Sequence, residues 1–136
     1  MRAILLLVAG SILGSCAYAP PPPYMERSPS GQRAYETLLA GKVPQSPITC
    51  LPNYYANEQT TIDGRTLAFR VGSRTTYIMH LSAGCEMLGS GTYALLSRQI
   101  AGPGMCRGDI EQVVDTMNHV TVGSCTITDI VPYVRP

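Results

Sequence analysis

Five cysteines constrain this 136-residue chain more than any other residue type. Cys50, Cys85, Cys106 and Cys125 are spread along the C-terminal three quarters of the sequence, whereas Cys16 stands alone near the N-terminus. The aromatic residues that usually build a core are few, with no Trp and one Phe. A folded part of about 100 residues can bury only a modest core. We therefore expect disulfides to contribute much of its stability.

Residues 1–15 have the pattern of an export signal. Arg2 is followed by an apolar run over 3–13, which is shorter than the roughly 20 residues that a membrane-spanning helix needs. The sequence Leu13-Gly14-Ser15-Cys16 looks like a lipobox, in which the cysteine thiol receives a lipid. The sequence therefore predicts a lipoprotein whose membrane contact is the lipid on Cys16. Ala17, by resemblance to enterobacterial lipoproteins, favours the outer membrane, facing the periplasm.

An alternative is ordinary cleavage after Ala17-Tyr18-Ala19, which would leave a soluble periplasmic protein. Pro20 would then directly follow the cut, and its fixed φ and missing N–H disfavour that position. Residues 16–29 are interpreted as a tether, because Pro20–Pro23 form a stiff polyproline II segment. A dozen such residues would hold the domain roughly 35 Å from the membrane.

Residues 30–136 are expected to form one small β domain with a single N-terminal helix. The helix is predicted over 30–41, with Ser30 as its cap, Gly41 at its end and one apolar face formed by Ala34, Tyr35, Leu38 and Leu39. Strands are predicted over 66–71 and 75–81, with further strands near 50–55, 92–97, 110–115 and 120–133, the last with a break. Turns are expected at 63–64, 72–73, 102–104 and 117–119.

Five or six short antiparallel strands would be unstable as an open flat sheet, because both edges and one face would be exposed. We therefore predict a mainly β fold, a small curled antiparallel sheet or barrel with the short helix packed on one side and disulfide staples.

With Cys16 assigned to lipid, four cysteines remain, and four cysteines allow three pairings. We favour Cys85 with Cys106, which joins two loops that flank one strand, and Cys50 with Cys125, which ties the first strand to the last. Zinc is not expected, because the sequence has no CxxC or HxxxH spacing. No cofactor or metal site is predicted.

The charges of the chain argue against nucleic acid as a partner. Ten Lys and Arg and nine Asp and Glu are present, and removal of Arg2 with the signal leaves nine of each, a net charge of zero. A neutral protein lacks the basic surface that phosphate backbones attract. Arg65, Arg70 and Arg74 are interpreted as solvated hairpin positions rather than as an anion site.

Several cysteine-centred fragments carry a family resemblance. They are Ile48-Thr49-Cys50, Asp63-Gly64-Arg65-Thr66-Leu67-Ala68-Phe69-Arg70, Cys85-Glu86-Met87-Leu88-Gly89, Met105-Cys106-Arg107-Gly108-Asp109-Ile110, and Cys125 with Val131-Pro132-Tyr133. Over residues 48–134 the chain resembles a family of small, uncharacterised exported proteins of Gram-negative bacteria, classed as a domain of unknown function. The resemblance implies a mostly β module with paired cysteines, and it implies no catalytic residues.

Candidate catalytic groups are few. His80, Ser82 and Asp109 could form a hydrolytic site, but no nucleophile elbow or orienting carboxylate is recognisable. Asp109 and Glu111 share one face of a strand, which we interpret as the solvent face with Ile110 in the core, and Asp109 could cap the loop beside Cys106. His119 falls in a turn.

The sequence thus favours a non-catalytic envelope lipoprotein, a binding or structural module for an envelope protein or cell-wall component. The alternatives are a small envelope hydrolase around His80, Ser82 and Asp109, and an inhibitor of an envelope-damaging enzyme.

Overall fold

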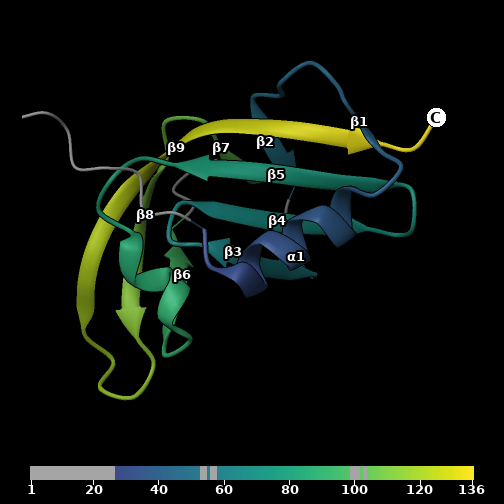
Figure 1. The fold of residues 1–136 in the computed structure, drawn as a ribbon. Coiled ribbons are helices and arrows are strands. Elements are labelled where there is room, and N and C mark those ends of the chain that lie inside the picture. Colours follow the sequence, from purple (N-terminus) through teal and green to yellow (C-terminus); the bar gives the residue numbers. More distant parts are fainter. Residues whose placement is uncertain (1–26, 53–54, 56–57, 99–101, 103) are drawn as a thin grey trace, which may run out of the picture.

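The computed structural model describes residues 27–136 except 53–54, 56–57, 99–101 and 103 (Figure 1). The predicted signal over 1–15, Cys16 and the tether up to residue 26 lie outside the described residues, as do parts of the strand expected at 50–55 and of the turn at 102–104. No helix in the described part combines the length and hydropathy needed to cross a membrane.

The single α-helix, α1, spans Pro29–Leu39, close to the predicted range. Ser28 caps it, accepting a hydrogen bond from the N–H of Gly31, so the prediction of Ser30 as the cap was wrong. The reason is Pro29, which occupies the first helical position, where a missing N–H costs nothing. The apolar face of α1 packs on the sheet residues Ile62, Ala68 and Ile78, as predicted for a helix on one side of the sheet.

The main sheet is antiparallel and runs in the order β3-β4-β5-β9-β8-β6. Its strands are β3 (Gln59–Asp63), β4 (Thr66–Val71), β5 (Thr75–Leu81), β6 (Tyr93–Ser97), β8 (Ile110–Asp115) and β9 (Thr121–Val134). The predicted bounds of β4, β5 and β8 are confirmed. β3 was not predicted, although a tight turn at Asp63-Gly64 requires a strand before it.

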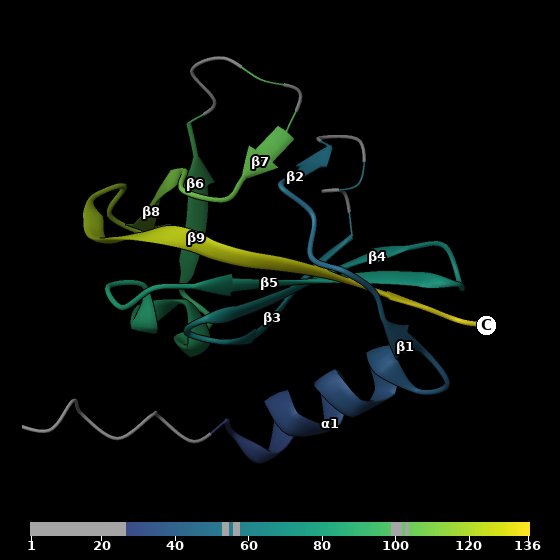
Figure 2. The ribbon, with the colours of Figure 1, turned by 90° about the horizontal axis from the view of Figure 1, so that it is seen from above.

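β9 continues for 14 residues, so the predicted break in it was wrong. Its first half pairs with β8, and its second half pairs with β5 on one side and with the two-residue β1 (Val43–Pro44) on the other. The pairing shifts between His80 and Leu81 and between Val113 and Val114. Such irregularities bend a strand, and β9 curls across the molecule as one arc (Figures 1 and 2). The predicted curled sheet with one helix is confirmed.

The concave side of the sheet is closed by a ribbon of β2 (Cys50–Pro52) and β7 (Gly104–Cys106) and by the 3₁₀-helix η2 (Glu86–Ser90). The buried core there includes Leu51, Leu67, Phe69, Met79, Leu81, Leu88, Val113, Ile127 and Ile130. Because α1 covers the opposite face, β4 is buried on both sides: Thr66, Leu67, Ala68 and Phe69 are all inaccessible. Although residue types alternate along β4 in the sequence, neither face of the strand is exposed to solvent over these four residues.

The four cysteines form two disulfides, Cys50–Cys106 and Cys85–Cys125. The favoured pairing of Cys85 with Cys106 and Cys50 with Cys125 was wrong. Cys50 lies directly opposite Cys106 in the β2–β7 ribbon, whereas Cys85 follows β5 and packs on β9. Two disulfides in a small domain are typical of proteins that fold in an oxidising compartment outside the cytoplasm.

Candidate functional site

The structure does not assemble the hydrolytic group suggested by the sequence. The Ser82 hydroxyl donates to the carbonyl of Ala83 and accepts from the N–H of Thr126, so it serves the backbone. The Asp109 carboxylate accepts the N–H of Cys106 at 2.8 Å, which confirms that it caps this loop. His80 is half-buried on β5, and within the described residues no hydrogen bond joins its ring to Ser82 or Asp109.

His119 and two of the three hairpin arginines, Arg65 and Arg70, also have structural positions. His119 lies in the exposed β8–β9 turn with a φ of 56°, as expected for a turn residue. Arg65 pairs with Glu86 at 2.9 Å and holds the pKa of that carboxyl below its ordinary value, together with backbone hydrogen bonds. Arg70 pairs with Glu58 at 2.7 Å.

Glu111 overturns the interpretation of β8. Its side chain is fully buried, whereas Ile110 is 66% exposed, so the solvent and core faces of this strand were assigned the wrong way round. Alternation along a strand identifies two faces but not which one points inward. In the curled sheet, Glu111 lies opposite Cys125 on β9 and opposite Ser97 on β6, on the concave side.

Among the described residues, only one of the two oxygens of the Glu111 carboxyl has a hydrogen-bond partner. The Ser97 hydroxyl donates to its Oε1 at 3.0 Å, while its Oε2 has no hydrogen-bond partner. Burial raises the pKa of Glu111; the Ser97 hydrogen bond opposes that shift and the nearby Asp109 charge adds to it. Burial of the Glu111 side chain therefore penalises its charged form relative to an exposed glutamate.

The Glu111 pKa predicts how stability depends on pH. A pKa raised in the folded state gives stability that is complete below the ordinary value of 4.5 and is lost as the pH rises through the folded value. As the pH rises from 4.5 through the folded-state pKa, the free energy of unfolding of the wild type should therefore fall relative to that of Glu111→Gln. Urea unfolding at several pH values measures this difference. Glu36→Gln, a change on the exposed side of α1, should keep the wild-type slope; parallel profiles for wild type and Glu111→Gln would contradict the assignment.

Within the described residues, β3 forms one edge of the main sheet and is exposed over its first three residues. Among the described strands β3 pairs with β4 only. The N–H of Arg70 donates to the carbonyl of Glu58 at 3.0 Å, and hydrogen-bonded pairs alternate along an antiparallel ladder. In this register Gln59 and Thr61 therefore direct their backbone N–H and C=O groups away from β4.

Within the described part of the chain, the first three residues of the β3 edge carry none of the usual protection against pairing. Its residues Gln59, Thr60 and Thr61 are exposed and uncharged, and two are β-branched. Edge strands are normally blocked by charges, prolines or a covering element. β1, the short strand beside β9, shows such a block, because it contains Pro44 and is followed by Pro47.

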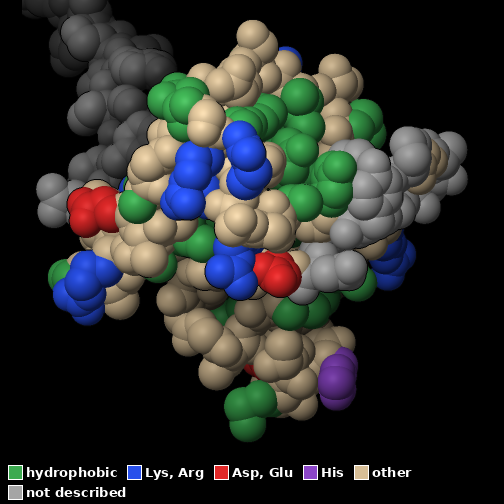
Figure 3. All heavy atoms as spheres, turned by 90° about the vertical axis from the view of Figure 1, so that its right-hand side faces the viewer, with side chains coloured by type: hydrophobic (Ala, Val, Ile, Leu, Met, Phe, Trp, Pro, Cys, Tyr) green, Lys and Arg blue, Asp and Glu red, His purple; other side chains and the backbone are tan. Residues whose placement is uncertain are grey.

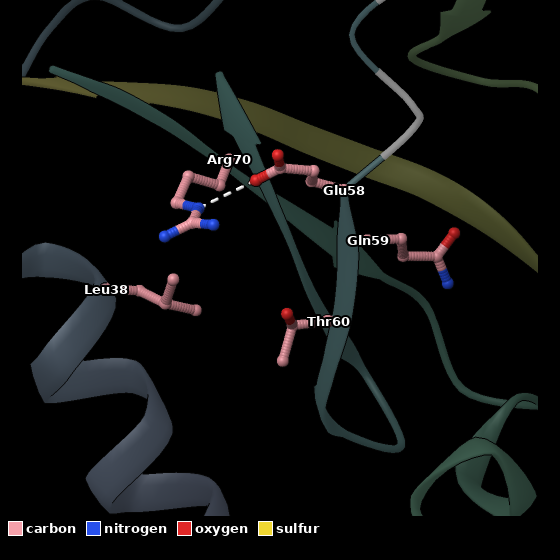
Figure 4. A pocket seen from close by; sticks show the side chains of 5 residues that line it. All are labelled: Leu38, Glu58, Gln59, Thr60 and Arg70. Atoms are coloured by element: carbon pink, nitrogen blue, oxygen red, sulfur yellow. Dashed lines mark hydrogen bonds and ion pairs between the residues drawn. The ribbon is translucent and has the colours of Figure 1, made fainter. Parts of the chain in front are cut away.

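A hollow lies beside this edge, between β3 and α1 (Figure 4). Its lining residues are Leu38, Glu58, Gln59, Thr60 and Arg70. In Figure 4 the side chains of Leu38, Thr60 and Arg70 approach one another from the helix and from the two strands, while Gln59 points away from the helix. We call the hollow and the adjoining β3 edge the edge groove. Sequence analysis missed it because its residues come from three elements.

In the described part of the chain, no three His, Cys, Asp or Glu side chains are grouped to hold a metal ion. Comparison with protein-family models, with curated proteins and with solved structures found no match to this chain.

Proposed function

We propose that this protein is an exported, lipid-anchored, non-catalytic binding module that adds an extended segment of an envelope partner protein to the edge of β3. The observation that carries the proposal is the edge groove, where the exposed, uncharged residues Gln59, Thr60 and Thr61 of β3 border a hollow against a helix. An extended peptide that joins such an edge gains main-chain hydrogen bonds, and its side chains reach the adjoining groove.

The anchor and the compartment support this proposal from the sequence. The lipobox at Leu13–Cys16 and the prolines that follow favour display of the domain on a tether. The two disulfides fit an oxidising compartment. Ser82 and Asp109, the hydroxyl and carboxylate of the alternative hydrolase, are both engaged with backbone groups, so the geometry favours binding over catalysis.

The proposal is tested by removing one outward N–H of β3. Peptides are selected from a random decapeptide display library on the purified, oxidised protein, and their dissociation constants are measured for wild type and Gln59→Pro. Because Gln59 directs its N–H away from β4, proline removes a hydrogen bond to the peptide while leaving the β3–β4 ladder intact. We expect affinity to fall at least about tenfold, the equivalent of one to two hydrogen bonds.

Gln59→Val is the matched control, because it changes the same side chain and keeps the N–H. It should bind within about threefold of wild type. Amide chemical shifts of the wild-type protein give a second measurement, in which Gln59 and Thr61 should move most on peptide addition. Equal losses in both variants, shifts centred elsewhere or a library without binders would each contradict strand addition.

A further inference from the structure

At its Arg70 end the edge groove adjoins a set of basic side chains near the C-terminal end of α1, which extends over β5 toward the end of β9. Lys42 donates to the carbonyl of Leu38 and to the hydroxyl of Thr76, both at 2.7 Å. Arg135 donates to the carbonyl of Ala40, and Arg74 donates to the carbonyl of Arg135, both at 3.4 Å. We call Lys42, Arg70, Arg74 and Arg135 the basic rim.

The members of the basic rim are close enough to affect one another. Burial lowers the pKa of Lys42, and the charges of Arg135 and Arg70 lower it further. Arg70 also lines the hollow, and Glu58 is the acidic residue paired with it. In Figure 3, which faces the right-hand side of Figure 1, Lys and Arg side chains gather on this surface. The rim therefore carries an excess of positive charge at one end of the groove, in a chain whose overall charge is near neutral.

The direction of an added strand decides which of its two ends lies near Arg70. Arg70 lies opposite Glu58, just before the first residue of β3. A strand that pairs antiparallel with β3 runs in the opposite direction, so its C-terminal residues lie beside the start of β3. Antiparallel pairing is slightly the more stable arrangement. The C-terminal part of the bound segment would thus lie at the Arg70 end of the edge groove, from which the basic rim extends over β5 toward the end of β9.

We propose, resting on the proposed function, that the partner segment binds antiparallel to β3 and carries Asp or Glu side chains toward its C-terminal end, which the basic rim recognises. The positive charge of the rim is distributed over four side chains: Lys42 before β1, Arg70 on β4, Arg74 in the β4–β5 turn and Arg135 after β9. It therefore suits several carboxylates along a segment better than a single terminal carboxylate.

The test uses the peptides selected from the library. They should be enriched in Asp and Glu in their C-terminal half, and replacing these residues with Asn and Gln should weaken binding at least about fivefold at low salt. Amidation of the peptide C-terminus should have little effect. The double variant Arg70→Gln/Arg74→Gln should abolish the preference for acidic over amide peptides. Arg33→Gln, on the exposed side of α1, should keep it, and salt should reduce it.

The outcomes separate the two proposals. Selected peptides that shift Gln59 and Thr61 but lack acidic residues would overturn the role of the rim and leave strand addition standing. A library without binders would count against strand addition itself and against the inference that rests on it. Binding of the protein to phosphatidylglycerol vesicles through Arg70 and Arg74, without a preference among peptides, would assign the rim to lipid and overturn the inference.

Discussion

Replacement of Cys85 and Cys125 together by alanine is expected to lower the free energy of unfolding by about 4 kcal/mol. The disulfide closes a loop with a sequence separation of 40 residues, so its loss releases chain entropy in the unfolded state. Cys85 is 0% and Cys125 is 4% exposed, so the variant also loses packing inside the core. Urea unfolding under non-reducing conditions measures the change.

The Cys50→Ala/Cys106→Ala double variant is the control for chain entropy. Its disulfide spans 56 residues, so loop closure alone predicts a loss at least as large. Cys50 and Cys106 are only half-buried in the β2–β7 ribbon, and we therefore expect a smaller packing loss at that site. A smaller loss for Cys85 and Cys125 than for Cys50 and Cys106 would show that packing around the buried disulfide adds nothing. Disulfide-linked peptides in a proteolytic digest of the wild-type protein, made without reductant, verify which cysteines are paired.

Gly84→Ala is expected to destabilise the protein by more than about 3 kcal/mol. Gly84 has a φ of 110°, which side chains rarely adopt. An added methyl group there would also overlap the backbone carbonyl of Ser124 on β9. Because this crossing lies next to Cys85–Cys125, relief of the overlap would move the segment away from its disulfide partner. Thermal unfolding measures the effect.

Gly72→Ala is the matched control for backbone strain. Gly72 has a positive φ of 61° in the β4–β5 turn, but an added methyl group would meet no atom within 4 Å. Only the strain of the left-handed conformation remains, which costs about 1 to 2 kcal/mol. Similar losses for both variants would contradict the assigned close approach at Gly84.

The parts of the fold that were predictable are those that short-range patterns specify. The apolar spacing of Ala34, Tyr35 and Leu38 identified α1, and glycine turns bounded by alternating residues identified β4 and β5. The polar sequence Gln59-Thr60-Thr61 has no such alternation. β3 lies at an edge where little of it is buried, so few apolar residues were required there.

The features that were not predictable depend on how distant segments meet. The partner of each cysteine depends on the separate β2–β7 ribbon and on the passage of residues 82–85 over β9. The burial of Glu111 depends on the direction in which the sheet curls. The edge groove brings Leu38 beside Thr60 and Arg70 only after α1 docks on the sheet. Arg70 was identified from the sequence, but its position beside an open strand edge was not.

The continuity of β9 has a consequence for local opening of the molecule. One strand pairs with β8, β5 and β1, and it also carries Cys125. Detachment of β9 would break these ladders together. We therefore expect that neither half of the sheet can open while the other half stays paired. Amide hydrogens along β5, β8 and β9 should therefore exchange with solvent at one shared slow rate, set by global unfolding. Those of β3 can exchange through smaller fluctuations.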